Sequence, residues 1–281
     1  MLGSRHEEIT QELLVIMLPK YTALLGRLLP SVSLWKKTVL QSIEHLFLLV
    51  NHGSKNSDVL TSHLPFIDHI LKLIQNPFFL NKLPNQFSSS ELQLIDTTIY
   101  LLSNCISNST ILTHIKEKKL SSVFLRYTSA EDESIVYNTH SLLAYTTGDD
   151  DIQSMKDPGA LLSTVFNAFK HSVEENSSNS IQLLQTMQAL VQHEQLKEEI
   201  VKQNMLGFLI QSTDRLVGTA LALLLKLLCT LAFNSKIADV LRDNDDLKEK
   251  VQELSKDSEE EEEVHKAADG LVWKLVKGRR K

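Results

Sequence analysis

Glycine and proline are scarce in this chain, with 9 Gly and 6 Pro among 281 residues. Sandwiches and barrels of many short strands need turn residues at roughly every 8–12 positions, and this supply does not meet that need. The motifs G-x-G-x-x-G and G-x-x-x-x-G-K-[ST] do not occur, which argues against Rossmann and P-loop sites. Hydrophobic residues make up 42% of the chain, too many for a disordered protein. These absences leave a folded, mostly helical protein.

Cysteine is also scarce. The two thiols, Cys105 and Cys229, lie within apolar helical runs, so we expect two small buried side chains and a reducing compartment. The opening residues, Met1 to Glu12, are polar and lack the apolar core of an export signal. We therefore expect a cytoplasmic location, with the nucleus as an alternative.

Charge of one sign is concentrated only near the end of the chain. The formal net charge is −6, and six acids fall within Asp257–Glu263, so the rest of the chain is neutral overall. Six basic residues follow between Val264 and Lys281, and the ending Gly278–Lys281 is of a kind used as a nuclear signal or an anionic-surface contact. No basic stripe with interleaved aromatics occurs elsewhere, so we expect no nucleic-acid partner.

Apolar residues recur at helical spacing along most of the chain, and no segment alternates in the manner of a strand. Ser88-Ser-Ser-Glu91 has the pattern of a capping box, and Asp157-Pro158-Gly159 suits a turn before a helix. The apolar run Leu216–Phe233 carries a single charge, Lys226, near its middle, so we expect a buried core helix and no membrane span. The expected helices are 7–18, 32–51, 65–75, 91–107, 120–128, 133–146, 160–172, 181–193, 196–203, 206–212, 216–233, 236–242, 247–254 and 259–276.

Several predicted helices end with the same sequence pattern, an apolar stripe followed by a short polar segment, here called the polar exit. The segment Leu101–Asn108 aligns with Leu227–Asn234 without a gap. Between and around them lie similar segments, and a further apolar residue follows some ten positions after each (Ile115, Met155, Ile200, Leu241). The equivalent positions are Leu49, Cys105, Tyr145, Leu190, Leu231 and Leu275. After a first step of 56 residues, lengthened by an inserted loop at 77–90, the steps are 40–45 residues, close to the roughly 40–47 of armadillo and HEAT units.

Over nearly its whole length the chain resembles an armadillo repeat protein. The resemblance lies in a long third helix with a small polar exit, followed by patterns such as Asn204-Met-Leu-Gly-Phe-Leu-Ile210, which is similar to the family's second helix. It implies an all-α, right-handed α-solenoid over residues 1–256, an acidic connector at 257–263, and a terminal capping helix with a basic tail at 264–281. HEAT-like units remain an alternative, because only Gly159 matches the family's frequent glycine before the second helix.

The resemblance implies a non-enzymatic scaffold or adaptor that binds a protein partner on its concave face. The segment His265–Leu275 also resembles the closing helix of armadillo regions that precede a TIR domain in some multidomain invertebrate proteins. A regulatory or oligomerisation region of a TIR-type signalling protein is therefore an alternative. A chaperone-regulating solenoid is another.

Candidate partner-binding residues follow from the same resemblance. In nuclear-import armadillo proteins, Asn and Trp residues on the third helices hold an extended basic peptide, the amide bonding the backbone and the indole faces holding lysine stems. The Asn-equivalent positions here are Leu48, Asn104, Ala144, Ala189, Thr230 and Lys274, and the Trp-equivalent positions are Glu44, Tyr100, His140, Gln185, Lys226 and Gly270. Only Tyr100 with Asn104 resembles a complete pair, so import-signal binding is not expected. The candidate residues are Tyr100, Asn104, His140, Gln185 and Lys226.

No pattern in the sequence predicts catalysis. The histidine pairs His45/His52 and His63/His69 lack the i, i+4 spacing of a helical metal pair, and neither H-E-x-x-H nor G-x-S-x-G occurs. Acidic residues lie in charged runs rather than in apolar surroundings that would shift a pKa. We therefore expect no catalytic residues, no metal, no cofactor and no small-molecule substrate.

Overall fold

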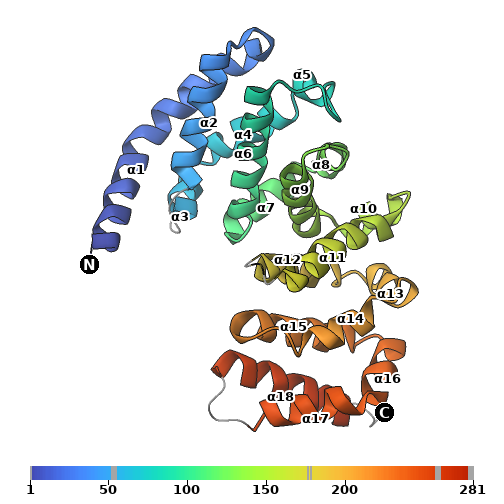
Figure 1. Cartoon of the computed structure of the whole chain (residues 1–281). Helices are drawn as coiled ribbons and strands as arrows, with labels where there is room; N and C mark the ends of the chain where they lie inside the picture. The colour runs from blue at the N-terminus through green and yellow to red at the C-terminus, as the bar shows by residue number, and fades with distance from the viewer. Residues whose placement is uncertain (1, 52–55, 176, 178, 257–260, 278–281) are drawn as a thin grey trace. The chain divides into compact units, whose positions relative to one another are not determined.

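The computed structural model describes residues 2–51, 56–175, 177, 179–256 and 261–277. These residues are helical with short connections and contain no strand (Figure 1). They form two compact units, Met1–Thr147 and Gly148–Lys281. Part of the predicted acidic connector (257–260) and the predicted basic ending (278–281) lie outside the described residues.

Unit 1 contains three long third helices that pack in sequence, α2 against α6 and α6 against α9. Shorter first and second helices connect them, and an N-terminal helix with a 3-10 turn precedes them (Figure 1). The elements of unit 1 are α1 (Leu2–Leu28), η1 (Leu29–Leu34), α2 (Lys37–Asn51), α3 (Asn56–Thr61), α4 (Leu64–Ile74), α5 (Pro77–Leu80), α6 (Ser89–Cys105), α7 (Ser109–Glu117), α8 (Ser121–Tyr127) and α9 (Glu133–Thr146).

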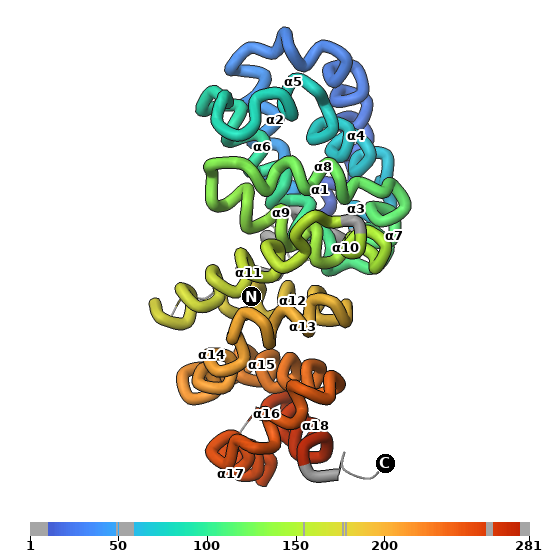
Figure 2. Tube along the Cα trace, turned by 90° about the vertical axis from the view of Figure 1, so that its right-hand side faces the viewer, coloured from blue at the N-terminus to red at the C-terminus, as the bar shows by residue number. Residues whose placement is uncertain are grey.

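Unit 2 repeats the arrangement, with α12 packed on α15 and α15 on α18 (Figure 2). The second helices α11 and α17 pack on the third helices α12 and α18. The elements are α10 (Asp149–Ser154), α11 (Pro158–Glu174), α12 (Ser180–Leu190), α13 (Glu194–Lys202), α14 (Met205–Ser212), α15 (Gly218–Leu231), α16 (Ser235–Asp243), α17 (Asp245–Leu254) and α18 (Glu262–Lys277).

The predicted series of equivalent residues falls in the last turns of the six third helices. Cys105, Leu190, Leu231 and Leu275 are buried, as predicted. Tyr145 is half-buried, and the side chain of Leu49 lies outside the described residues. Helix α15, predicted as a buried core helix, buries seven of its residues, including Leu224 and Leu228. The spacing therefore identified the repeat unit correctly.

The polar exits in the repeat pattern are helix N-caps. Asn108 and Asn234 adopt nearly the same backbone conformation (φ −87°, ψ 118° and φ −81°, ψ 125°). The side-chain oxygen of Asn234 accepts from the backbone N–H groups of Lys236 and Ile237, at 3.2 and 3.4 Å. His193 has the same conformation before α13, with φ −84° and ψ 120°. The exit ends one repeat and starts the first helix of the next, which explains why it recurs.

Replacing Asn234 by alanine is expected to lower the free energy of unfolding by about 1 kcal/mol, because two N–H groups at the start of α16 lose their acceptor. Asn234→Asp is the control, since the carboxylate keeps an acceptor at the same place. Urea denaturation of the two variants beside the wild type measures the difference. Equal losses in both variants would show that the cap does not stabilise α16.

Several expected helix bounds differ from the structure. The expected helix 32–51 is interrupted, because Trp35 is extended (φ −67°, ψ 126°) and its indole N–H donates to the carbonyl of Leu28 at 3.1 Å. The expected helix 7–18 continues through Pro19 to Leu28. Helices α3, α7 and α10 were not predicted as ranges, although buried Ile115 in α7 is one of the apolar residues expected after each repeat.

Other local predictions are confirmed. The carboxylate of Glu91 accepts from the backbone N–H of Ser88 at 2.8 Å, as the capping box requires. Helix α11 starts at Pro158, and Asp157 caps it through the N–H of Ala160 at 3.1 Å. The segment predicted as an inserted loop at 77–90 contains the short helix α5 before α6 begins.

Candidate partner-binding surface

In unit 1 the two residues of the candidate pair lie one turn apart on the solvent-exposed side of α6. The Tyr100 side chain is 41% exposed, and Asn104 is exposed. The neighbouring third helices offer no equivalent pair. On α2 the two positions hold an acidic residue, Glu44, and an apolar one, Leu48, and both are only half-exposed. On α9 the Asn-equivalent residue, Ala144, is buried. Unit 1 therefore presents one amide–aromatic pair.

His140 does not join this pair at the surface. Its side chain is only 5% exposed, and Nδ1 lies 2.7 Å from the carbonyl oxygen of Val136. Burial disfavours the charged imidazolium and lowers the pKa of His140, an effect that the Val136 carbonyl partly offsets. A buried histidine that bonds within its own helix has little area left for a partner.

In unit 2 the predicted residues lie on an exposed stripe. Gln185 of α12 is exposed, as is Lys226 of α15. On α15, Thr219 and Phe233 continue the exposed row, seven residues before and after Lys226, which is the spacing of one helix side. The Phe233 side chain, just past the end of α15, is 67% exposed. The row therefore combines hydroxyl, cationic and aromatic groups.

Helix α18 adds a second cation and a second aromatic group. The ammonium group of Lys274 lies 3.4 Å from the centroid of the Phe233 ring, a cation–π contact between neighbouring third helices. The adjacent Trp273 is 58% exposed. Phe233 and Trp273 were not among the predicted residues. Trp273 directly precedes the Asn-equivalent position Lys274, whereas Phe233 lies three residues after the Asn-equivalent position Thr230. A large aromatic side chain near such a position was the only signal in the sequence. We call Gln185, Lys226, Phe233, Trp273 and Lys274 the third-helix surface of unit 2.

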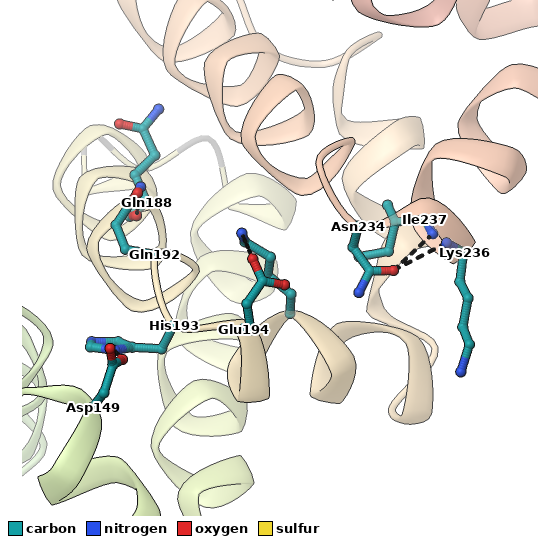
Figure 3. A network of polar contacts seen from close by, with 9 residues as sticks. Asp149, Gln188, Gln192, His193, Glu194, Asn234, Lys236 and Ile237 are labelled. Atoms are coloured by element: carbon teal, nitrogen blue, oxygen red, sulfur yellow. Dashed lines mark hydrogen bonds and ion pairs between the residues drawn. The ribbon is translucent and has the colours of Figure 1, made fainter. Parts of the chain in front are cut away.

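Side-chain hydrogen bonds connect α12 and the residues after it to α15 and α10, and Figure 3 shows Gln188, Gln192, His193 and Asp149. The side-chain amide of Gln188 in α12 donates to the carbonyl of Leu223 in α15 at 2.8 Å. Gln192 donates in turn to the carbonyl of Gln188 at 3.0 Å. His193 follows Gln192 directly, and its Nδ1 lies 2.5 Å from the carboxylate of Asp149 in α10. The helices that carry the exposed residues are therefore packed and bonded to one another in the absence of a partner.

Other chemistry finds little support in these residues. No group of three His, Cys, Asp or Glu side chains within the described ranges is arranged to hold a metal ion. Cys105 is buried, and burial raises the pKa of its thiol to about 12. Cys229 is half-buried beside Lys274, and burial raises the pKa of its thiol as well. Both thiols are therefore protonated and poorly nucleophilic at neutral pH.

One helical stretch of the described chain, Gln11–Leu34, is long and apolar enough to cross a membrane by length and composition. The stretch considered from the sequence, 216–233, contains the shorter helix Gly218–Leu231.

Comparison with solved structures identifies the fold. No family model and no curated protein matches the sequence. A designed armadillo repeat protein matches the structure with a TM-score of 0.60 at 14% identity, covering 89% of this chain and 98% of that one. Two engineered proteins match with TM-scores of 0.61 and 0.53, at 12% and 14% identity. They cover 90% and 83% of this chain and are themselves covered over 97% and 57%.

These identities are low, so the likeness concerns the fold alone. It agrees with the repeated set of first, second and third helices in each unit. The chain has an armadillo-type repeat fold, all-α and of the α-solenoid class.

Proposed function

We propose that the chain is a non-enzymatic protein-interaction scaffold, and that the third-helix surface of unit 2 binds an extended acidic segment of a partner protein. The observation that carries the proposal is the contact of Lys274 with the exposed ring of Phe233, next to Trp273 and on the row that contains Lys226. A helical-repeat fold supports this class of function, because stacked helices offer a long, pre-formed surface.

The chemistry of the surface indicates the kind of segment. The ammonium groups of exposed Lys226 and half-exposed Lys274 attract carboxylates, and the faces of Phe233 and Trp273 offer contacts to apolar side chains. The exposed amide of Gln185 can both donate to and accept from a peptide backbone. A basic import-type peptide would meet lysines of its own sign here. The surface therefore suits acidic segments that carry one or two apolar side chains.

Selection from a displayed library of disordered peptides tests the proposal. The wild-type chain is expected to enrich peptides rich in Asp and Glu with an apolar residue between them. The double variant Lys226→Glu/Lys274→Glu is expected to bind the enriched peptides at least about tenfold more weakly, because attraction becomes repulsion. Lys236→Glu, an exposed lysine on the first helix α16, is the matched control and should bind like the wild type.

Two results would contradict the proposal. One is a failure of the wild-type chain to enrich any peptide class. The other is unchanged affinity of the enriched peptides for the double variant, which would place their binding site elsewhere. Phe233→Ala separates the apolar contribution, and we expect it to weaken binding without changing the preference for acids.

A further inference from the structure

Exposed apolar side chains gather at the N-terminal end of unit 1. Of the thirteen large apolar side chains exposed in the described residues, five lie between residues 13 and 34. The solvent-facing side of a helix in a folded domain is expected to be polar. The exposed side of α1 departs from that expectation. The five are Leu13 (55% exposed), Val15 (51%), Ile16 (60%), Leu24 (46%) and Leu34 (78%).

Helix α1 is held to unit 1 by its inner side only. Leu14, Leu18 and Leu25 are buried, and α1 packs against α3, α4 and η1. At Gly26 the helix approaches α4 closely, since a Cβ atom there would lie 3.1 Å from Nε2 of His69. Figure 1 shows α1 at the outside of unit 1, with its other side facing no helix of that unit.

The outer side of α1 mixes apolar and basic residues. Leu13, Ile16, Lys20, Leu24 and Arg27 recur at helical spacing, and all are exposed. Val15 and Leu24 are nine residues apart and so point about 180° apart around the helix. The exposed apolar surface therefore covers roughly half of the helix circumference.

The surroundings of the helix carry positive charge and an interfacial aromatic residue. Between Gln11 and Lys37 there are four basic residues, Lys20, Arg27, Lys36 and Lys37, and one acid, Glu12. Trp35, half-exposed, follows η1 directly.

An apolar groove of about 490 Å³ runs between α1 and α2. Its lining includes Leu24 and Leu28 from α1 and Val39 and Ile43 from α2. The groove continues the apolar surface of α1 from Leu24 towards α2.

We propose that α1 and η1 dock on an anionic phospholipid surface and lie along it, with the outer apolar side chains in the lipid and the four basic residues at the headgroups. Apolar and basic residues on one exposed helix are what such a surface binds. Although Gln11–Leu34 has the length of a span, its inner side is packed on unit 1, and Lys20 and Arg27 lie within it. The helix therefore lies on the membrane rather than crossing it.

The charge distribution argues against the other occupants. In a two-fold pair of α1 helices, Lys20 and Arg27 of one copy would face the same residues of the other, and like charges repel. A single partner helix covers about a third of a helix circumference, whereas the exposed apolar arc of α1 is wider. A lipid surface accommodates both the width of the arc and the positive charge.

Co-sedimentation of the full chain with vesicles tests this proposal. We expect binding to phosphatidylcholine vesicles that contain phosphatidylserine, little binding to phosphatidylcholine alone, and weaker binding at raised salt. Leu13→Gln/Ile16→Gln and Lys20→Glu/Arg27→Glu should each reduce the partition coefficient by at least about tenfold. Val217→Gln/Val240→Gln, which removes two exposed apolar side chains from unit 2, is the matched control and should bind like the wild type.

Circular dichroism checks that each variant keeps the helix content of the wild type, and light scattering gives its oligomeric state. Absence of phosphatidylserine-dependent binding by the wild type would overturn the proposal, as would binding of either α1 variant as strong as that of the wild type. A wild-type dimer that becomes a monomer in Leu13→Gln/Ile16→Gln would assign the surface to a second copy of the chain instead.

Discussion

Replacing Phe66 by alanine is expected to lower the free energy of unfolding of unit 1 by about 3–5 kcal/mol. Phe66 lies in α4, is fully buried, and meets Phe47 of α2 edge to face, with ring centroids 6.0 Å apart at 87°. The substitution leaves a cavity between a second helix and the third helix that precedes it, and it also removes an aromatic pair worth about 0.5–1.5 kcal/mol. Both losses fall on one contact between repeats.

The two tryptophans allow this loss to be measured in one unit. Trp35 lies in unit 1 and Trp273 in unit 2, and the chain contains no other tryptophan. In a Trp273→Phe background, tryptophan fluorescence during urea unfolding reports on unit 1 alone. Leu13→Ala in the same background is the control, because Leu13 also lies in unit 1, is 55% exposed, and its truncation should change stability by less than about 0.5 kcal/mol. Similar midpoints for Phe66→Ala and its parent would contradict the packing described here.

The sequence predicted the repeat architecture well because burial and capping recur at fixed intervals. A third helix must bury one apolar stripe against its neighbours, so residues such as Leu190 and Leu231 stand at equivalent places. The exit asparagines recur because each has to cap the next first helix. Both requirements are local, and a single sequence therefore displays them.

The first helices were harder to predict. Helix α7, with the sequence STILTHIKE, holds few apolar residues and buries only Ile111 and Ile115. Its start is set by the Asn108 side chain, which accepts from the N–H groups of Thr110 and Ile111 at 3.1 and 3.3 Å. Hydrophobic periodicity is weak in so short a helix, and packing against the neighbouring helices decides its conformation.

The candidate residues show a second limit. Spacing in the sequence predicts on which side of a helix a residue lies, but it does not predict how far neighbouring helices bury that side. His140 and Lys226 were assigned to equivalent positions, yet His140 is buried and Lys226 is exposed. Phe233 escaped prediction because it follows the last turn of α15, outside the positions that the resemblance compares. Depth depends on the neighbouring helices, which a repeat pattern does not describe.

Leu231→Ala is expected to lower the free energy of unfolding of unit 2 by about 2–5 kcal/mol. Leu231 ends α15, is fully buried, and is one of the residues that the spacing identified from the sequence. Because α15 packs against both α12 and α18, the cavity would weaken contacts on two sides, and surrounding helices can collapse into it only in part.

A Trp35→Phe background leaves Trp273 of α18 as the fluorescent probe of unit 2, so that urea unfolding followed at this residue reads the loss directly. Val240→Ala on α16 is the control for truncation of an apolar side chain, because Val240 is 50% exposed and its loss opens no cavity. Leu190→Ala on α12 should behave like Leu231→Ala, since it occupies the equivalent position one repeat earlier and is equally buried. If both leucine variants unfold like the Val240 variant, the equivalent positions do not form the core of unit 2, and the repeat phase derived from them is wrong.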